Sequence, residues 1–585
     1  MRRYQPKFGR ATLKHFRNIF SARQKSRPKA VGQEQLVEVA GFVEPYISEL
    51  RFQNGARLTL TENSMVVFVG PNGSGKTGAL RQVSTLQEAP QRPGPISSLR
   101  VHGGGSAKAI KNWIDANCGV TDARYNNEVS RGGVAVSFIG YSDTTIQSVS
   151  ELFCTFLSTE ERLSYIQPPK IIAAATKGAT HAIQLLYQTP ELEDRISSAF
   201  RRAFGRDLIV HRHAGDIIPL YCGNRSRLPA VDQHRREFTA ELEKLTKLEH
   251  EGDGLKSYAT ALLQLLALRQ IVCCIDEPEA FLHPPQAEQL GEMVASNSGS
   301  GQFFIATHSA NFLRGLLSRR EEDIHVVRLV RDDTSTAAHV LPSDKLRAII
   351  RDPFLRYSNV LEGIFNQRVV LCEAESDCTF YRAQYLALGG SHETLFVPCG
   401  GKSKIPDALK FLSALSVDTE CVVDFDLLRD RGVLRKLCDH KGIAWQSVYP
   451  SLDKLAGYIA TEKSSFDKHR LELELRSALD LSVGSAVATE TLERISAATR
   501  KADPWTMLKR SGIAAVPSGE IYVATEALIS LLAQHGIYVV PVGELEGFCR
   551  SIGLHGPEWV ERVLELDLLH APELEEARRF VRRLS

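Results

Sequence analysis

The residues from Gly70 to Thr77, GPNGSGKT, have the types and the spacing of a phosphate-binding loop. They follow an apolar run, MVVFVG, that favours a strand, and they precede a stretch that favours a helix. In such a loop the backbone amides hold the phosphates, the lysine neutralises their charge and the hydroxyl group coordinates Mg²⁺. We therefore predict an ATP site. The residues expected to bind ATP and its magnesium ion here are Gly70, Asn72, Gly73, Gly75, Lys76 and Thr77.

A second apolar run, IVCCI, ends in two acids, Asp276 and Glu277, as a Walker B strand does. We expect Asp276 to hold the magnesium ion of the nucleotide and Glu277 to orient or deprotonate the attacking water. A third run, FFIATHS (303–309), contains His308, which we expect to sense the γ-phosphate. A histidine at a strand end is more often structural, but this setting favours a function for His308.

The segment Asp253-Gly-Leu-Lys-Ser257 precedes a helical pattern, YATALLQLLAL. One interpretation is a plain helix cap. The other is that Gly254 and Ser257 bind the γ-phosphate of ATP held by another ATPase domain, at the start of the helix. Because the chain contains one such phosphate-binding loop, the second interpretation predicts a homodimer or a higher even oligomer.

Acidic residues follow two more apolar runs. VVLC ends in Glu373-Ala-Glu-Ser-Asp377, and ECVV ends in Asp424-Phe-Asp426. In an α/β sheet both ends can lie at one carboxyl edge, and Asp424 and Asp426 point to the same side of an extended chain. Clustered carboxylates repel one another unless a divalent cation joins them. We therefore predict a Mg²⁺ or Mn²⁺ site at Glu373, Asp377, Asp424 and Asp426, which suits phosphoryl transfer.

These motifs need two α/β domains to position them. Alternating strand-like and helical stretches run from residue 36 and resume near residue 366, so we place domains at 36–360 and 361–585. A mostly helical insertion is expected at about 450–515. Residues 1–35 form a basic arm with no acid before Glu34, which either binds a nucleic-acid backbone or is a solvated leader.

Finer expectations concern segments outside the motifs. The segments 88–106, 521–524 and 557–583 are expected to be a loop, a strand and a C-terminal helix, respectively. His211 and His213 have no motif around them and are expected to be surface histidines.

The composition sets the broad class. The chain has 585 residues, 43% hydrophobic and 24% charged, with a formal charge of +2, which argues against wholesale disorder and makes bulk charge uninformative about nucleic acid. The eleven cysteines have no regular spacing, so we expect reduced thiols. No run is apolar enough to span a bilayer and no secretory signal is evident, so a cytoplasmic protein without a membrane partner is expected.

Several of these motifs resemble known families. EPEAFLHPPQ and FFIATHS resemble segments of ABC-type ATPases of the RecF/SMC-like group. The carboxylate pattern resembles the Toprim motif, with Ala374 where glycine is usual. PVGELEGF resembles a segment that completes the metal site in OLD (overcoming lysogenisation defect) nucleases, which would make Glu546, rather than Glu544, a ligand. Val542 stands where some relatives have a lysine; if a lysine is needed to stabilise the transition state, Lys509 and Lys402 are the candidates to replace it.

The order of the parts resembles the OLD family of ATP-dependent endonucleases, which includes the Gabija nuclease subunit. The resemblance implies an α/β fold in which an ABC-type P-loop ATPase domain is followed by a Rossmann-like Toprim domain. It also implies cleavage of DNA, a role in antiphage defence, and a helicase-like or other partner encoded nearby. The alternative is a RecF/SMC-like DNA-binding ATPase whose Toprim core is a scaffold. A primase-like polymerase is a weaker third reading.

Overall fold

The structure is a computed structural model. It describes residues 38–584 except for these segments: 123–126, 132–133, 139–143, 173–178, 230–235, 267–270, 298–300, 320–321, 333–334, 343–344, 348–350 and most of 466–503. The predicted basic arm at 1–35 lies outside the described residues. The chain is an α/β protein with two largely parallel sheets, as expected.

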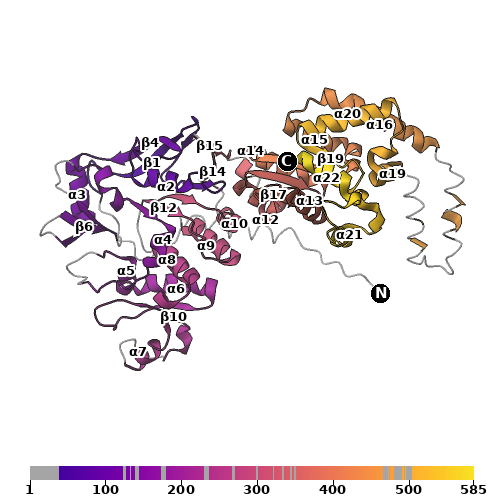
Figure 1. Cartoon of the computed structure of the whole chain (residues 1–585). Coiled ribbons are helices and arrows are strands. Elements are labelled where there is room, and N and C mark those ends of the chain that lie inside the picture. The colour runs from indigo at the N-terminus through magenta and orange to yellow at the C-terminus, as the bar shows by residue number, and fades with distance from the viewer. Residues whose placement is uncertain are drawn as a thin grey trace, which may run out of the picture. The chain divides into compact units, whose positions relative to one another are not determined.

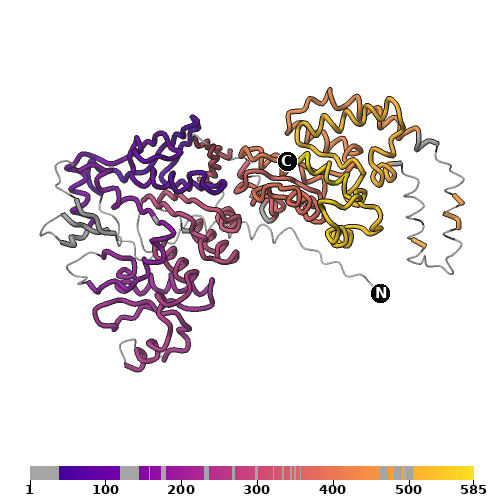
Figure 2. The backbone as a smooth tube through the Cα atoms, in the orientation of Figure 1, coloured from indigo at the N-terminus to yellow at the C-terminus, as the bar shows by residue number. Residues whose placement is uncertain are grey.

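The first of these sheets has six strands in the order β15-β14-β3-β13-β12-β8. Neighbours from β14 to β12 are parallel, and β15 is antiparallel to β14. All residues of β3, β12 and β13 are buried, which explains why these strands read as continuous apolar runs. The bounds are β3 Met65–Val69, β8 Cys154–Leu157, β12 Val272–Asp276, β13 Gln302–Ala306, β14 Ile324–Arg331 and β15 Thr336–Val340. Strands from distant parts of the chain thus share one sheet. Figure 2 traces the backbone of these segments from indigo to magenta.

Helices α9 (Pro284–Asn297) and α10 (Ala310–Arg319) lie side by side after β12 and β13 (Figure 1). Their contact is close because each contributes a glycine. A Cβ atom on Gly291 would lie 2.2 Å from the carbonyl oxygen of Phe312, and one on Gly315 would lie 2.0 Å from that of Glu288. The glycines therefore let the two backbones touch.

The second parallel sheet has four strands in the order β17-β16-β18-β19. All of its neighbours are parallel, so the strands end at the same edge. The bounds are β16 Arg368–Cys372, β17 Thr394–Pro398, β18 Asp418–Val423 and β19 Ile537–Val539. Glu373 and Asp424 directly follow β16 and β18, so the fold brings the predicted metal ligands to one edge.

Helices cover both faces of this sheet. One face carries a core that includes Val370, Val422 and Tyr538 and packs on Phe380 and Trp559. Helix α14 (Ile405–Ala414) packs on β16 and β18, and its Leu412 approaches Gly363 beside Val369. The helices of the first face are α13 Glu375–Ala387, α21 Gly556–Val563 and α22 Glu575–Val581 (Figure 1). The result is a three-layer α/β/α arrangement.

Three further sheets are small. Strands β1 (Val43–Phe52), β2 (Arg57–Thr59) and β4 (Ile96–Gly104) form one in the order β2-β1-β4. The other two follow the orders β5-β6-β7 and β11-β10-β9. Their bounds are β5 Gly119–Asp122, β6 Asn127–Arg131, β7 Val134–Phe138, β9 Asp207–Val210, β10 Leu220–Gly223 and β11 Thr246–Lys247.

Contacts divide the chain into two compact units. The first unit comprises Met1–Pro45, Gly103–Thr155 and Thr159–Ile271, and the second comprises Tyr46–His102, Phe156–Ser158 and Val272–Ser585. The phosphate-binding loop and the carboxylates both belong to the second unit. The domain boundaries drawn from the sequence remain proposals. Helices of the first unit are α3 Ala107–Asn117, α4 Thr159–Ser164, α5 Ala182–Gln188, α6 Pro190–Phe204, α7 Arg236–Leu242 and α8 Asp253–Leu266.

Four finer expectations are wrong. Residues 521–524 are helical, within α20 (Glu520–Gln534), because the packing of α20 on α16 (Trp445–Ser465) and β19 outweighs the strand propensity of Ile-Tyr-Val. The segment 557–583 is broken between α21 and α22, and the expected loop at 88–106 contains β4. His211 is buried, at 2% exposure, and its Nδ1 accepts a hydrogen bond from the backbone amide of His213.

All eleven cysteines are free thiols, and ten are buried. Among the described residues, no single helix has the length and apolar character to cross a membrane. A helix pair, Trp505–Ala515 and Glu520–Gln534, passes that test only when combined and is bent by 87°.

Candidate functional site

The phosphate-binding loop joins β3 to α2 (Lys76–Ser84), as its sequence predicts. Three of its glycines, Gly70, Gly73 and Gly75, have positive φ angles of 132°, 73° and 93°. These angles turn the backbone in a way that other residues rarely allow. A side chain at Gly70 is also excluded by the carbonyl oxygen of Leu329, which would lie 2.2 Å from its Cβ atom.

Lys76 lies over this loop. Its ammonium group donates to the carbonyl oxygens of Gly70 and Pro71 at 2.9 and 2.8 Å. Burial lowers the pKa of Lys76 to about 8, against the opposing charges of Glu277 and Asp276. The Lys76 ammonium is thus partly desolvated and lies near two acids. A cation in this setting is suited to binding the phosphates of a nucleotide. Asn72 is exposed in the same loop.

The Thr77 hydroxyl donates to Oδ2 of Asp276 at 2.8 Å. Strand β13 lies between β3 and β12, and its Ala306 pairs with Phe68 on one side and with Asp276 on the other. The three strands therefore end level with one another. This register brings a hydroxyl and a carboxylate together where a nucleotide-bound Mg²⁺ ion would need them.

Glu277 and His308 face each other across the same edge. Nε2 of His308 lies 3.4 Å from Oε1 of Glu277. Glu277 has a φ of 47°, and its amide donates to the carbonyl oxygen of Ala306 at 2.8 Å. Burial lowers the pKa of His308, and the charge of Lys76 lowers it further. The lowered pKa favours the neutral form of the imidazole beside the candidate general base, although the charge of Glu277 opposes the shift.

Sequence reasoning missed Glu279. Its Oε1 accepts hydrogen bonds from the Thr307 hydroxyl and from the amide of His308, both at 2.8 Å, so it fixes the turn that presents His308. Burial raises the pKa of Glu279. The available signal was the second acid in Glu277-Pro-Glu279, directly after an apolar strand.

The helix that begins at Asp253 is α8, as predicted. Asp253 is exposed and Gly254 is half-buried, whereas Ser257 is fully buried with its hydroxyl unpartnered. The start of α8 is accessible to a ligand, but the side chain of Ser257 is not. A nucleotide-binding role for this segment remains a prediction and depends on the backbone near Gly254.

The second candidate site lies at the carboxyl edge of the four-stranded sheet. Oxygen atoms of Glu373, Asp424 and Asp426 all lie within 4.8 Å of one another. The amide of Asp424 also donates to Oε1 of Glu373 at 3.1 Å. The donor set of three carboxylates within one small volume fits a hard divalent cation such as Mg²⁺ or Mn²⁺.

Electrostatics at this edge favour a bound cation. Burial raises the pKa of Asp424 well above its usual range, and the charges of Glu373 and Asp377 raise it further. Burial likewise raises the pKa of Asp377 to about 6. Oδ2 of Asp377 accepts from the amide of Ala374 at 2.8 Å, which fixes the turn at the start of α13.

Two lysines approach the carboxylates. Nζ of Lys402 lies 2.7 Å from Oδ1 of Asp426. Nζ of Lys509, on α19 (Pro504–Ser511), lies 4.0 Å from Oδ2 of Asp424 and 3.9 Å from Oε2 of Glu544. Lys402 thus forms a close ion pair with Asp426, whereas Lys509 lies at a longer distance from two acids, Asp424 and Glu544.

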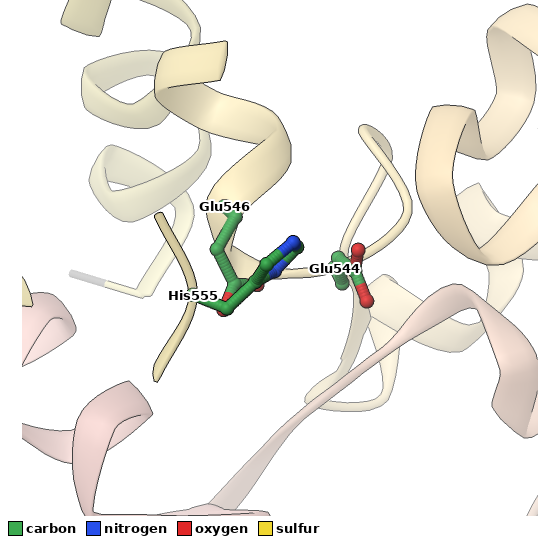
Figure 3. A group of neighbouring side chains, drawn as sticks. All are labelled: Glu544, Glu546 and His555. Carbon is green, nitrogen blue, oxygen red and sulfur yellow. The ribbon is translucent and has the colours of Figure 1, made fainter. Parts of the chain in front are cut away.

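Glu546 belongs to a neighbouring group with Glu544 and His555, whose ligand atoms also lie within 4.8 Å of one another. Figure 3 shows the His555 ring against the Glu546 side chain, with Glu544 beside them. Oε1 of Glu546 accepts from the amide of Gly556 at 2.7 Å. The group lines a cavity of about 270 Å³ that Arg510 and Arg550 also line.

The comparisons with known proteins concern the ATPase part of the chain. Residues 146–314 match a family described as "AAA domain, putative AbiEii toxin, Type IV TA system". The matched range contains Asp276, Glu277 and His308 and begins after the phosphate-binding loop. Together, the match and the loop geometry make this part an AAA-type P-loop ATPase domain. A search of the curated proteins finds no match.

Among solved structures, the chain is similar to an SMC head bound to the C-terminal winged-helix domain of ScpA. That pair has 10% identity and a TM-score of 0.33, over 52% of this chain and 100% of that one. The SMC head domain from Thermotoga maritima has 13% identity and a TM-score of 0.26, over 50% and 97%.

Proposed function

We propose that this protein is an ATP-dependent DNA endonuclease with an ABC-type ATPase and a Toprim nuclease site. The observation that carries the proposal is the convergence of Glu373, Asp424 and Asp426 within 4.8 Å, in a chain that also has an ATP site. Clusters of this kind serve phosphoryl transfer. The resemblance to the OLD family supports DNA as the substrate.

At the ATP site each residue has a distinct task. The loop amides and Lys76 bind the phosphates, and Thr77 and Asp276 hold the magnesium ion. Glu277 accepts a proton from the attacking water, and His308 contacts the γ-phosphate. Glu279 orients His308 through its backbone amide.

At the nuclease site, Glu373, Asp424 and Asp426 would hold one divalent cation, and Asp377 shapes the turn beside them. Glu546, with Glu544 and His555, offers a second ligand set next to the first. When bound there, a divalent cation would supply an activated water and would stabilise the leaving oxygen during cleavage of a phosphodiester. Lys509, whose ammonium lies 4.0 Å from Asp424 and 3.9 Å from Glu544, would contact the scissile phosphate.

A second copy of the chain is expected to complete the ATP site. The start of α8 near Gly254 is accessible, and helix N-termini bind phosphate. Closure of the dimer on ATP would then regulate cutting. The resemblance adds antiphage defence and a helicase-like or other partner encoded nearby, in the cytoplasmic setting expected from the sequence.

The alternative is a RecF/SMC-like DNA-binding ATPase in which the Toprim core is a scaffold. One contact favours it, since the Lys402 ammonium lies 2.7 Å from Asp426 and can neutralise that acid without a metal ion. The two functions differ in whether DNA is cut or only bound.

The test is incubation of the purified full-length protein with supercoiled and linear DNA in Mg²⁺ or Mn²⁺, with and without ATP. Nicking or linearisation that requires the cation is expected, and the ATP lanes give the sign of the regulation. DNA binding and ATP hydrolysis without cleavage under all these conditions would select the scaffold alternative.

A further inference from the structure

Arg328 is a buried charge that neither site uses. It lies on β14, is 1% exposed, and hydrogen-bonds to four backbone carbonyl oxygens. Within the described part of the chain, no carboxylate pairs with it. Burial lowers the pKa of Arg328 to about 10, which shows how poorly solvated the guanidinium is.

The four carbonyls come from the two segments that lead into the carboxylate-bearing strands. Ile364 and Asn366 accept at 3.1 and 2.8 Å, at the end of the 3₁₀ helix Asn359–Phe365, just before β16. Leu415 and Ser416 accept at 3.3 and 2.9 Å, at the end of α14, just before β18. Glu373 and Asp424 directly follow strands β16 and β18.

The backbone of Arg328 is joined to the phosphate-binding loop on its other side. In the parallel register of β14 and β3, Arg328 is the partner of Val69, the residue before Gly70. The next residue, Leu329, places its carbonyl oxygen against Gly70, where no Cβ atom fits. If the loop shifts when a nucleotide binds, it therefore pushes directly on β14.

The geometry around Arg328 requires a guanidinium. Its planar group offers five N–H donors in a rigid fork, whereas a lysine offers one point charge. The cation also lies at the C-terminal end of α14, where the helix dipole favours it. Ser416 there has a φ of 53°, an unusual value for a residue with a side chain, and its carbonyl faces Nη1 of Arg328.

We propose that Arg328 is the positioning residue through which nucleotide binding at the phosphate-binding loop is transmitted to the strands that carry Glu373 and Asp424. The inference rests on the proposed ATP site and concerns its regulation of the carboxylate site. The connection is short, because the guanidinium of Arg328 joins β14, which pairs with the strand before the loop, to the segments that precede both β16 and β18.

The test is hydrogen–deuterium exchange of the full-length protein in Mg²⁺, with and without a non-hydrolysable ATP analogue. In the wild-type protein we expect the analogue to slow exchange at the loop and also at residues 364–373 and 415–424. The slowing at the distant segments should be about fivefold or more, the lower end of typical coupling factors. Mg²⁺ is present in both states, so the nucleotide alone makes the difference.

Arg328→Met should keep the response at the loop and lose the response at the two distant segments. The matched control is Arg578→Met, since Arg578 is also buried and donates to carbonyl oxygens, those of Leu568 and Ala571, away from β14. It should keep both responses. If Arg328→Met does not fold, Arg328→Lys serves in its place, because an ammonium cannot reach four carbonyls.

A wild-type protein without slowing at the distant segments, or an Arg328 variant that keeps it, would overturn the inference. The exchange is measured without DNA. Absence of DNA cleavage would therefore refute the nuclease proposal, but the exchange experiment would still test the role of Arg328.

Discussion

The backbone amide of Asp424 donates a 3.1 Å hydrogen bond to the carboxylate of Glu373. This bond joins the ends of two adjacent parallel strands, β16 and β18, and sets the spacing between the acids that follow them. The spacing is short enough to place both carboxylates and Asp426 around one cation. It also holds like charges together when no cation is bound.

That arrangement predicts a stability cost. Asp424→Asn should raise the free energy of unfolding by roughly 0.5–2 kcal/mol in the absence of divalent cations, because it relieves the repulsion at the site. Thermal unfolding in EDTA at pH 8 measures this. Adding Mg²⁺ should then stabilise the wild-type protein more than the variant. An unchanged or lower melting temperature for the variant in EDTA would contradict the account.

Burial of a carboxyl group beside this cluster predicts a pH dependence. A carboxyl group whose pKa is raised on folding contributes stability below its unfolded pKa, and that stability is lost as the pH rises through the folded pKa. For Asp377 the pKa rises from 3.8 to about 6. Without metal, the wild-type protein should therefore lose stability between about pH 4 and pH 7 relative to Asp377→Asn, as urea titrations at each pH would show. Parallel pH profiles would exclude this assignment.

At the ATP site, Glu277→Gln should bind ATP as the wild-type protein does but hydrolyse it about 100-fold more slowly or worse, the usual size of a general-base effect. Lys76→Ala should lose ATP binding as well. Calorimetry measures ATP binding, and phosphate release measures ATP hydrolysis, so the two effects can be distinguished. Normal hydrolysis by Lys76→Ala would refute the ATP-site assignment.

Glu279 offers a matched pair of variants. Glu279→Gln keeps an oxygen that accepts from Thr307 and His308, so hydrolysis should fall only slightly. Glu279→Ala leaves both donors unpaired, which costs about 1–3 kcal/mol of stability and should displace His308. Hydrolysis and thermal unfolding of both variants check this. Equal loss of hydrolysis in the two would assign a charge effect to Glu279 instead.

Substitution of the two lysines at the nuclease site should have different effects. Lys509→Ala should bind Mn²⁺ more tightly, because a competing cation is gone, yet cut DNA about 100-fold more slowly at saturating Mn²⁺. Lys402→Ala should lose less than about tenfold, since Lys402 is committed to Asp426. Calorimetry and cleavage rates measure the two effects. Unchanged cleavage by Lys509→Ala at saturating Mn²⁺ would remove Lys509 from the mechanism.

The geometry of a motif was predictable where it depends on residues close to one another in the sequence. The loop from Gly70 to Thr77 carries its own turn chemistry, and the apolar runs before Asp276 and Asp424 are buried strands whose ends meet by the rules of parallel sheets. The meeting of Thr77 with Asp276 and the clustering of the three carboxylates follow from these features.

What depends on distant packing was not predictable. Residues 521–524 are helical because α20 packs on α16 and β19, which are distant in the sequence from one another. The grouping of Glu546 with His555 depends on a turn at Gly553–Gly556, and the role of Arg328 depends on four carbonyls far along the chain. These relationships are set by tertiary contacts rather than by periodicity.

The most direct test of the central claim is the rate of DNA cleavage in Mn²⁺ by Glu373→Gln beside Glu375→Gln. Glu375 is an exposed acid two residues away on α13, so the pair matches charge and location. We predict that cleavage is lost in Glu373→Gln and retained in Glu375→Gln. Cleavage by Glu373→Gln at the wild-type rate would contradict a nuclease site at these carboxylates.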